Sequence, residues 1–171
     1  MWIIKYMKTK LKKTTTPKGY EHWEIDYDNG LKSFNLSDIK LHLEPEQEKG
    51  YIKGEILSER LKEKSMNGAV LDYLLEHTDK IPTKWKGKYV YFWGTIYRNS
   101  GSYLHVRYLS WGGGGWRWCC SWLEDDWGSL NPAAVSRKSF ALESKSLSSD
   151  TLNLETRIKA LEERLNRYNL K

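Results

Sequence analysis

Apolar and polar residues alternate in several parts of the chain, and this period of two predicts β-strands. YEHWEIDY at residues 20–27 alternates and is followed by Asp-Asn-Gly and LKSF, an order typical of a tight hairpin. IKLHL at residues 39–43 alternates again and predicts a further strand that ends before Pro45. The first fifty residues therefore predict mainly β structure.

Residues 50–82 have a longer period, with apolar residues every three or four positions. This spacing predicts two amphipathic helices, because it places the apolar side chains on one side of each helix. Asn67 can cap the second helix, and Pro82 follows its end. The expected buried positions are Ile52, Ile56, Leu57 and Leu61 in the first helix and Val70, Leu71, Leu74 and Leu75 in the second.

Residues 88–98, 103–111 and 116–123 return to a period of two, and the short loops NSGS and GGGG join them. Loops this short connect antiparallel neighbours, so the three segments predict a meander. Strict alternation in the first strand would place Val90, Phe92, Gly94 and Ile96 on one face and Tyr89, Tyr91, Trp93 and Tyr97 on the other. The two helices can cover one face, which leaves the other to the N-terminal hairpin, another subunit or a ligand.

The last twenty residues show a heptad repeat, in which Leu154, Leu161 and Tyr168 occupy d and Ile158 and Leu165 occupy a. This pattern predicts a coiled coil and therefore a homo-oligomer. The alternative is a helix that packs on its own domain.

Charged positions beside the heptad core add to the coiled-coil prediction. Arg157 at g and Glu162 at the following e would meet across parallel helices. RIKALE, at residues 157–162, resembles a short coiled-coil motif that specifies trimers. The resemblance implies a trimer, and a dimer is the alternative.

The expected fold class is α+β, with an antiparallel Trp- and Tyr-rich meander, two helices and a C-terminal coiled-coil helix. We expect a basic arm over residues 1–19 and the α+β domain over residues 20–135. Residues 136–150 are Ser-rich and predict a linker, and residues 151–171 form the terminal helix.

The formal net charge of +6 comes entirely from the N-terminal arm, which contains six lysines and no acidic residue. The remaining basic and acidic residues are equal in number, at 22 each. The arm can bind phosphate groups of nucleic acid, or it can be a partly disordered tail that increases solubility. Its candidate nucleic-acid contacts are Lys5, Lys8, Lys10, Lys12 and Lys13.

Tryptophan is concentrated at residues 111–127, where five indoles occur in seventeen positions. These side chains can form the core, or an exposed subset can bind a protein partner, a proline-rich peptide, a sugar or a base. Acidic residues at 124–126 weaken the case for nucleic acid on this face. The candidate ligand-binding residues are Tyr97, Tyr103, Trp111, Trp118 and Trp122.

A family resemblance covers residues 51–135. LDYLLEHTDKIPTKWKGKYVYFWGTIYR, the spaced tryptophans to WLEDDW, and NPAAV resemble a family of small uncharacterised bacterial proteins, often with a charged heptad tail. The resemblance implies a bacterial origin and a shared domain, and it implies no activity.

Signals for catalysis are sparse in this chain. The histidines lack metal-ligand spacing, and Gly112–Gly115 precede a strand where a phosphate loop would precede a helix. Cys119 and Cys120 are adjacent, which predicts neither a disulfide nor a metal site. We therefore expect no catalytic residue, cofactor or metal, although an enzyme using Glu124, Asp125 and Asp126 is a minor alternative.

No apolar run is long enough for a membrane span, which favours a soluble, cytoplasmic protein. The expected function is that of an oligomeric binding or adaptor protein that docks a partner on its aromatic sheet face. A nucleic-acid-associated protein and a carbohydrate-binding module are the alternatives.

Overall fold

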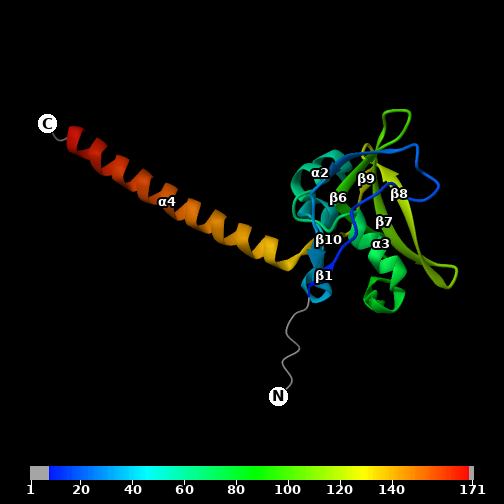
Figure 1. Cartoon of the computed structure of the whole chain (residues 1–171). Coiled ribbons are helices and arrows are strands. Elements are labelled where there is room, and N and C mark those ends of the chain that lie inside the picture. The colour runs from blue at the N-terminus through cyan, green and yellow to red at the C-terminus, as the bar shows by residue number, and fades with distance from the viewer. Residues whose placement is uncertain (1–7, 170–171) are drawn as a thin grey trace, which may run out of the picture. The chain divides into compact units, whose positions relative to one another are not determined.

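A computed structural model of the chain describes residues 8–169 and divides it into two compact units, Met1–Ser136 and Arg137–Lys171 (Figure 1). The first unit is an α+β domain and the second is a single helix. Among the described residues, no helix is both long and apolar enough to cross a membrane.

The centre of the α+β unit is a sheet with the strand order β4-β10-β6-β7-β8, and β2 also pairs with β6. The strands β6, β7 and β8 form the predicted antiparallel meander, whereas β10 runs parallel to β6. The bounds are β2 (Glu24–Asp28), β4 (Ile39–His42), β6 (Val90–Arg98), β7 (Leu104–Gly112), β8 (Gly115–Trp122) and β10 (Ala133–Ser136).

Two short strand pairs and several helices surround this sheet. The pairs are β1 (Thr9–Lys10) with β3 (Ser33–Phe34) and β5 (Ile52–Lys53) with β9 (Asp126–Trp127). The helices are α1 (Pro45–Lys49), α2 (Gly54–Leu61) and α3 (Gly68–Glu76), with 3-10 turns η1 (Leu36–Asp38), η2 (Thr78–Lys80) and η3 (Thr83–Trp85).

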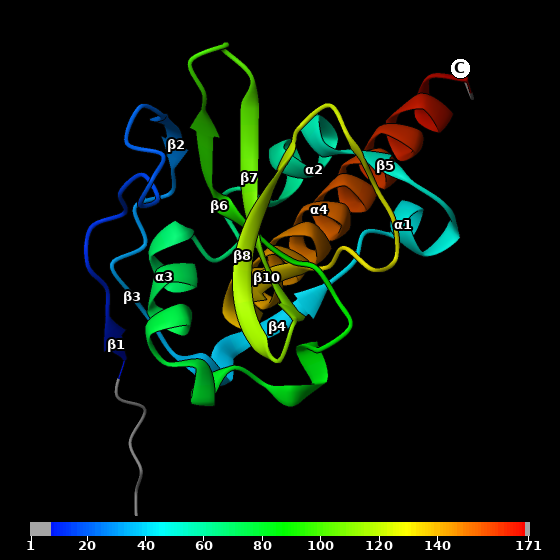
Figure 2. The same cartoon turned by 90° about the vertical axis from the view of Figure 1, so that its right-hand side faces the viewer.

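The helices α2 and α3 lie on opposite sides of the meander (Figure 2). Val70, Leu71 and Leu74 of α3 are fully buried in a core that also contains Phe92 and Leu109 of the sheet. On the other face, the aromatic rings of Tyr91 and Trp93 pack against Trp127, and Leu57 and Leu61 of α2 are fully buried. Each face therefore has its own helix, which corrects the expectation that both helices cover one face.

The predicted N-terminal hairpin does not form, because β2 pairs with β6 and β3 pairs with β1. Asn29 explains the difference. Its side-chain Nδ2 donates to the carbonyl oxygens of Lys62 and Ser65 at 3.0 and 2.9 Å, and its N–H donates to Gly94 O at 2.9 Å. The Asn-Gly pair is therefore a corner anchored to the sheet, and the chain leaves β2 in a new direction.

A β-bulge in β6 changes which side chains share a face. Tyr91 pairs with Tyr108, but Tyr97 pairs with His105, so β6 advances six residues while β7 advances three. This odd difference of three residues reverses the alternation between residues 91 and 96. Gly94 lies in this stretch, and a Cβ there would approach the carbonyl oxygens of Ser65 and Met66 to 2.8 Å. Tyr97 consequently shares a face with Val90, which corrects the strict alternation expected from the sequence.

The second unit consists of α4 (Arg137–Asn169), and the helix begins at Arg137 where the sequence predicted a linker. Residues 137–150 contain neither glycine nor proline, and lysine, alanine, leucine and glutamate occur among the serines. These residues favour a helix and allow it to continue without a break. Helix therefore replaces the expected linker from Arg137 onwards, and Ser136 is the last residue of β10.

Candidate functional site

Within the α+β unit, the N-terminal segment from residue 8 to residue 18 lies on the side where α3 covers the sheet (Figure 2). Its anchor is Thr14, which is buried and whose Oγ1 donates to Asp28 Oδ1 at 3.3 Å. Asn67 and Thr95 donate to the same carboxylate oxygen at 3.2 and 2.8 Å. Thr95 Oγ1 also accepts from Gly68 N at 2.8 Å, so the network joins the segment to the first turn of α3.

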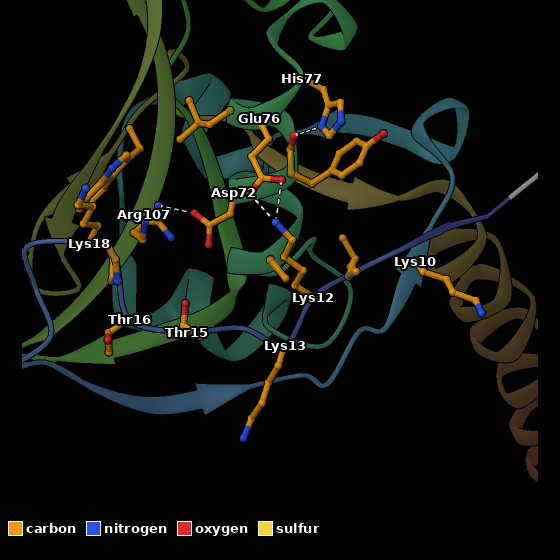
Figure 3. Close-up of a pocket in the computed structure, with 16 residues that line it drawn as sticks. Lys10, Lys12, Lys13, Thr15, Thr16, Lys18, Asp72, Glu76, His77 and Arg107 are labelled. Carbon is orange, nitrogen blue, oxygen red and sulfur yellow. Dashed lines mark hydrogen bonds and ion pairs between the residues drawn. The ribbon is translucent and has the colours of Figure 1, made fainter.

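Between this segment and α3 lies a cavity of about 790 Å³ (Figure 3). Its volume is in the range of sites for small organic ligands. The lining combines basic groups with apolar side chains and two carboxylates. It comprises Lys10, Leu11, Lys12, Lys13, Thr15, Thr16, Pro17 and Lys18 from the segment, Ala69, Asp72, Tyr73, Leu75, Glu76 and His77 from α3 and its end, and Arg107 and Trp118 from the sheet.

Arg107, on β7, forms the inner wall of the cavity, and its side chain is only 2% exposed. Its guanidinium carbon lies 4.3 Å from the centre of the Trp118 ring, and Nη2 donates to Asp72 Oδ1 at 2.9 Å. Nη1 has a longer hydrogen bond of 3.4 Å to the Tyr97 hydroxyl. Nε has no hydrogen-bond partner among the described residues, so this buried cation is incompletely paired.

The lysines of the segment differ in direction. Lys12 points towards α3 and its Nζ lies 2.9 Å from Glu76 Oε1, whereas Lys13 points away from the helix (Figure 3). The pKa of Glu76 is lowered by its hydrogen bond to Lys12.

Lys10 and Lys13 also line a second cavity of about 690 Å³ on the β3 side of the segment. The five basic groups of the first cavity outnumber its two carboxylates, so the lining favours an anion.

This arrangement bears on the expected nucleic-acid arm. Residues 10–13 and 15–18 line the cavity beside α3 and so pack on the rest of the domain. Lys8 is exposed, and Lys10, Lys12 and Lys13 line the cavities. Lys5 lies outside the described residues.

The five predicted aromatic ligand contacts do not form one exposed surface. Tyr97 is fully buried because the bulge turns it towards α3, and burial raises its pKa. Trp118 is half-buried beneath Tyr20, with ring centres 5.3 Å apart. Tyr103 and Trp122 are about half exposed and stack on each other at 5.5 Å. Trp111 lies near the opposite end of the β7–β8 hairpin, with Lys86 Nζ 3.6 Å from its ring centre.

The predicted oligomerisation residues all fall within α4. Leu154, Ile158 and Leu161 are 56%, 54% and 61% exposed, so this apolar stripe has no cover within the described part of the chain. Leu147 extends the stripe one heptad towards the N-terminus and is 61% exposed. Arg157 and Glu162 are also exposed. Leu165 and Tyr168 also fall in α4, but their side chains are outside the part of the chain that the structure describes.

Other candidate chemistry is limited. No group of three or more His, Cys, Asp or Glu residues within the described chain could hold a metal ion. Burial raises the pKa of the Cys120 thiol to about 11. The carboxylates at 124–126 are exposed, and Asp126 forms an ion pair of 3.0 Å with Lys53.

Sequence reasoning did not single out Arg107 or Asp72 as a pair. The available signal was a single charged residue in the middle of a mostly apolar strand, because such a residue usually needs a buried partner. Comparison of the chain with protein-family models, curated proteins and solved structures gives no match. The resemblance of residues 51–135 to a bacterial family therefore stays a prediction.

Proposed function

We propose that the protein is a non-enzymatic, self-associating binding protein whose α+β unit holds an anionic ligand in the cavity beneath residues 10–18. The observation that carries the proposal is the incompletely paired guanidinium of Arg107 in the cavity wall. A bound carboxylate or phosphate would accept hydrogen bonds from a cation that the protein has already removed from water.

The remaining lining favours a ligand that also has an apolar part. Trp118, Leu11 and Leu75 provide an apolar wall beside the basic groups. The carboxylates of Asp72 and Glu76 oppose an anion, but each already has a basic partner within 2.9 Å. An aromatic phosphate or carboxylate combines both requirements, because its ring can contact the apolar wall while its anion faces Arg107.

The proposal can be tested with anilinonaphthalene sulfonate, a fluorescent aromatic anion, on the full chain. Phenyl phosphate should displace this probe, and phenol should not. Lys18→Gln and Arg107→Lys should each weaken probe binding several-fold. The first substitution removes a positive charge, and the second replaces the planar guanidinium, which can donate two parallel hydrogen bonds, with an ammonium group.

Lys84→Gln is the matched control, since Lys84 is exposed and lines neither described cavity. It should leave probe affinity unchanged. Equal displacement by phenol, or an equal loss in the Lys84 variant, would contradict the proposal. Circular dichroism should show that the Arg107 variant is folded before its affinity is interpreted.

The self-association part of the proposal rests on the exposed stripe of α4. A helix with apolar residues at a and d buries them against copies of itself, and the Arg157–Glu162 pairing fits parallel copies. Light scattering after size-exclusion chromatography should show that the full chain associates, as a trimer or a dimer through α4. Leu161→Asp should lower the measured molar mass, because it removes the association through α4. Leu152→Asp should retain the oligomer, because Leu152 is 66% exposed but lies outside the heptad core positions.

A further inference from the structure

The strand β8 is an open edge of the sheet. It pairs with β7 on one side, and no strand within residues 8–169 pairs with it on the other (Figure 1). None of its eight residues is buried, whereas eight of the nine residues of β6 are. β8 contains neither lysine nor proline, which commonly protect edge strands from pairing with another chain. The edge is therefore available to a further strand.

The hairpin geometry determines which backbone N–H and C=O groups of β8 point towards the open edge. Gly112 pairs with Gly115 across a two-residue turn, and Leu123 N donates to Leu104 O at 3.0 Å beyond the other end. Hydrogen-bonded and non-hydrogen-bonded pairs alternate in an antiparallel ladder. The odd-numbered residues of β8 therefore bond to β7, and the backbone N–H and C=O groups of Trp116, Trp118, Cys120 and Trp122 face the open edge.

We infer that the β8 edge binds the β8 edge of a second copy, antiparallel and about a two-fold axis. Only residues that face outward can exchange hydrogen bonds across such an interface. One register pairs all four of them, with Trp116 opposite Trp122 and Trp118 opposite Cys120 of the second copy. Of the two neighbouring symmetric registers, one would place Trp122 opposite Gly114, whose φ of 80° belongs to the turn. The other would place Trp116 opposite Glu124, which lies beyond the end of β8.

Charge favours this self-pairing, because the two ends of β8 carry opposite charges. Arg117 lies near the glycine turn, and Lys86 sits over Trp111 at the same end. Glu124 and Asp125 follow the other end and are exposed. An antiparallel arrangement brings the acidic end of each copy to the basic end of the other, whereas a parallel arrangement would join like charges.

In this register, Cys119 would lie opposite Cys119 of the second copy, in a non-hydrogen-bonded pair. The Cα atoms of such a pair are about 4.5 Å apart, within the range of about 4.4–6.8 Å that a disulfide spans. Cys119 is exposed, so the interface can be reported by its oxidation.

The test is copper-phenanthroline oxidation of the full chain, followed by non-reducing electrophoresis. Wild-type protein and Cys120→Ser should give a disulfide-linked dimer, and Cys119→Ser should not. Failure of Cys120→Ser to link, or linkage that persists in Cys119→Ser, would overturn the proposed register.

Two further variants separate this edge from other causes of linkage. Leu161→Asp should still link, because the edge does not require α4, and loss of linkage in that variant would overturn the inference. Cys120→Pro removes an outward N–H at an edge position where proline is tolerated, so it should abolish linkage while circular dichroism stays unchanged. A folded Cys120→Pro protein that links as well as Cys120→Ser would exclude backbone pairing at β8.

Discussion

Asp72 of α3 accepts a 2.9 Å hydrogen bond from Arg107 of β7, and the two side chains are 40% and 2% exposed. The pair thus joins a group in contact with water to a cation that is almost completely removed from it. This unequal burial has opposite consequences for stability and for ligand binding.

Asp72→Asn should reduce the free energy of unfolding by about 1–3 kcal/mol, because the buried guanidinium loses its charged partner. The expected loss is smaller than for a fully buried pair, since water reaches Asp72. The same variant should bind anilinonaphthalene sulfonate more tightly, because one negative charge of the cavity is removed. Urea unfolding and probe titration measure the two effects. Asp79→Asn, at an exposed position, should change neither the free energy of unfolding nor the probe affinity. An Asp72→Asn protein with unchanged probe affinity would argue against Arg107 as the anion contact.

His105 should make stability depend on pH. Its two ring nitrogens have no hydrogen-bond partner among the described residues, its ring stacks on Trp23 at 4.6 Å, and burial lowers its pKa. The unfolded chain therefore binds a proton more readily than the folded chain, and stability decreases as pH falls through the ordinary histidine pKa of about 6.5 towards the lowered value.

His105→Phe keeps an aromatic ring against Trp23 and removes the titrating group. Between about pH 7.5 and about pH 5.5, it should lose less unfolding free energy than the wild type. The measurement is the urea midpoint at the two pH values. His22→Phe, at an exposed position, should follow the wild type, and identical pH dependence in the His105 variant would disprove the assignment.

The aromatic residues of β8 should differ in their importance for folding. Trp118→Ala should reduce stability by about 2–4 kcal/mol, because it removes a partly buried ring that packs on Arg107 and Tyr20. Trp122→Ala should reduce it by less than about 1 kcal/mol, since Trp122 is 50% exposed. Thermal unfolding of the two variants gives the comparison. Equal losses would mean that the stacked Tyr103–Trp122 pair is as structural as Trp118.

Charge exchange in α4 should distinguish the orientation of the associated helices. In parallel copies, the heptad places Arg157 opposite Glu162 but Asp150 opposite Glu155. Glu155→Lys should therefore strengthen association by about 0.5 kcal/mol for each pair, and Glu162→Lys should weaken it by a similar amount. Thermal unfolding of α4 at several protein concentrations measures both. Both substitutions change the net charge equally, so shifts in the same direction would be evidence against the parallel register.

Gly94→Ala should destabilise the α+β unit by about 1–3 kcal/mol, because the new methyl would approach two carbonyl oxygens of the chain before α3 to 2.8 Å. Gly115→Ala is the matched control. A Cβ at Gly115 meets nothing within 4 Å, and this substitution should leave the urea midpoint nearly unchanged. Similar midpoints for both variants would mean that the backbone beside the bulge relaxes to accept a side chain.

Elements whose signal is local were predictable from the sequence. The meander follows from period-two segments joined by short loops, and α3 follows from its apolar spacing and from Asn67, which accepts a hydrogen bond from Val70 N. The α+β class is confirmed for the same reason. Strand partners at long range were not predictable, because Asn29 anchors to Lys62 and Ser65, residues more than thirty positions away.

The candidate site was predictable only in part. The sequence identified the arm lysines and Trp118, but alternation alone placed Tyr97 on the wrong face, since nothing in a period-two pattern marks the position of a bulge. The cavity requires the N-terminal segment to lie beside α3. That placement depends on Thr14 and its hydrogen bond to Asp28, which the sequence pattern does not reveal.

The bulge in β6 also limits how this domain can change during evolution. On an ordinary strand, substitutions alter one side chain at a time and leave its neighbours in place. Deletion of one residue near Gly94 would instead move every side chain on one side of the deletion to the opposite face of the sheet. The side chains of Thr95 and Tyr97 would then point away from α3, which they contact at Gly68. The length of β6 should therefore be preserved among descendants of this domain more strictly than its composition.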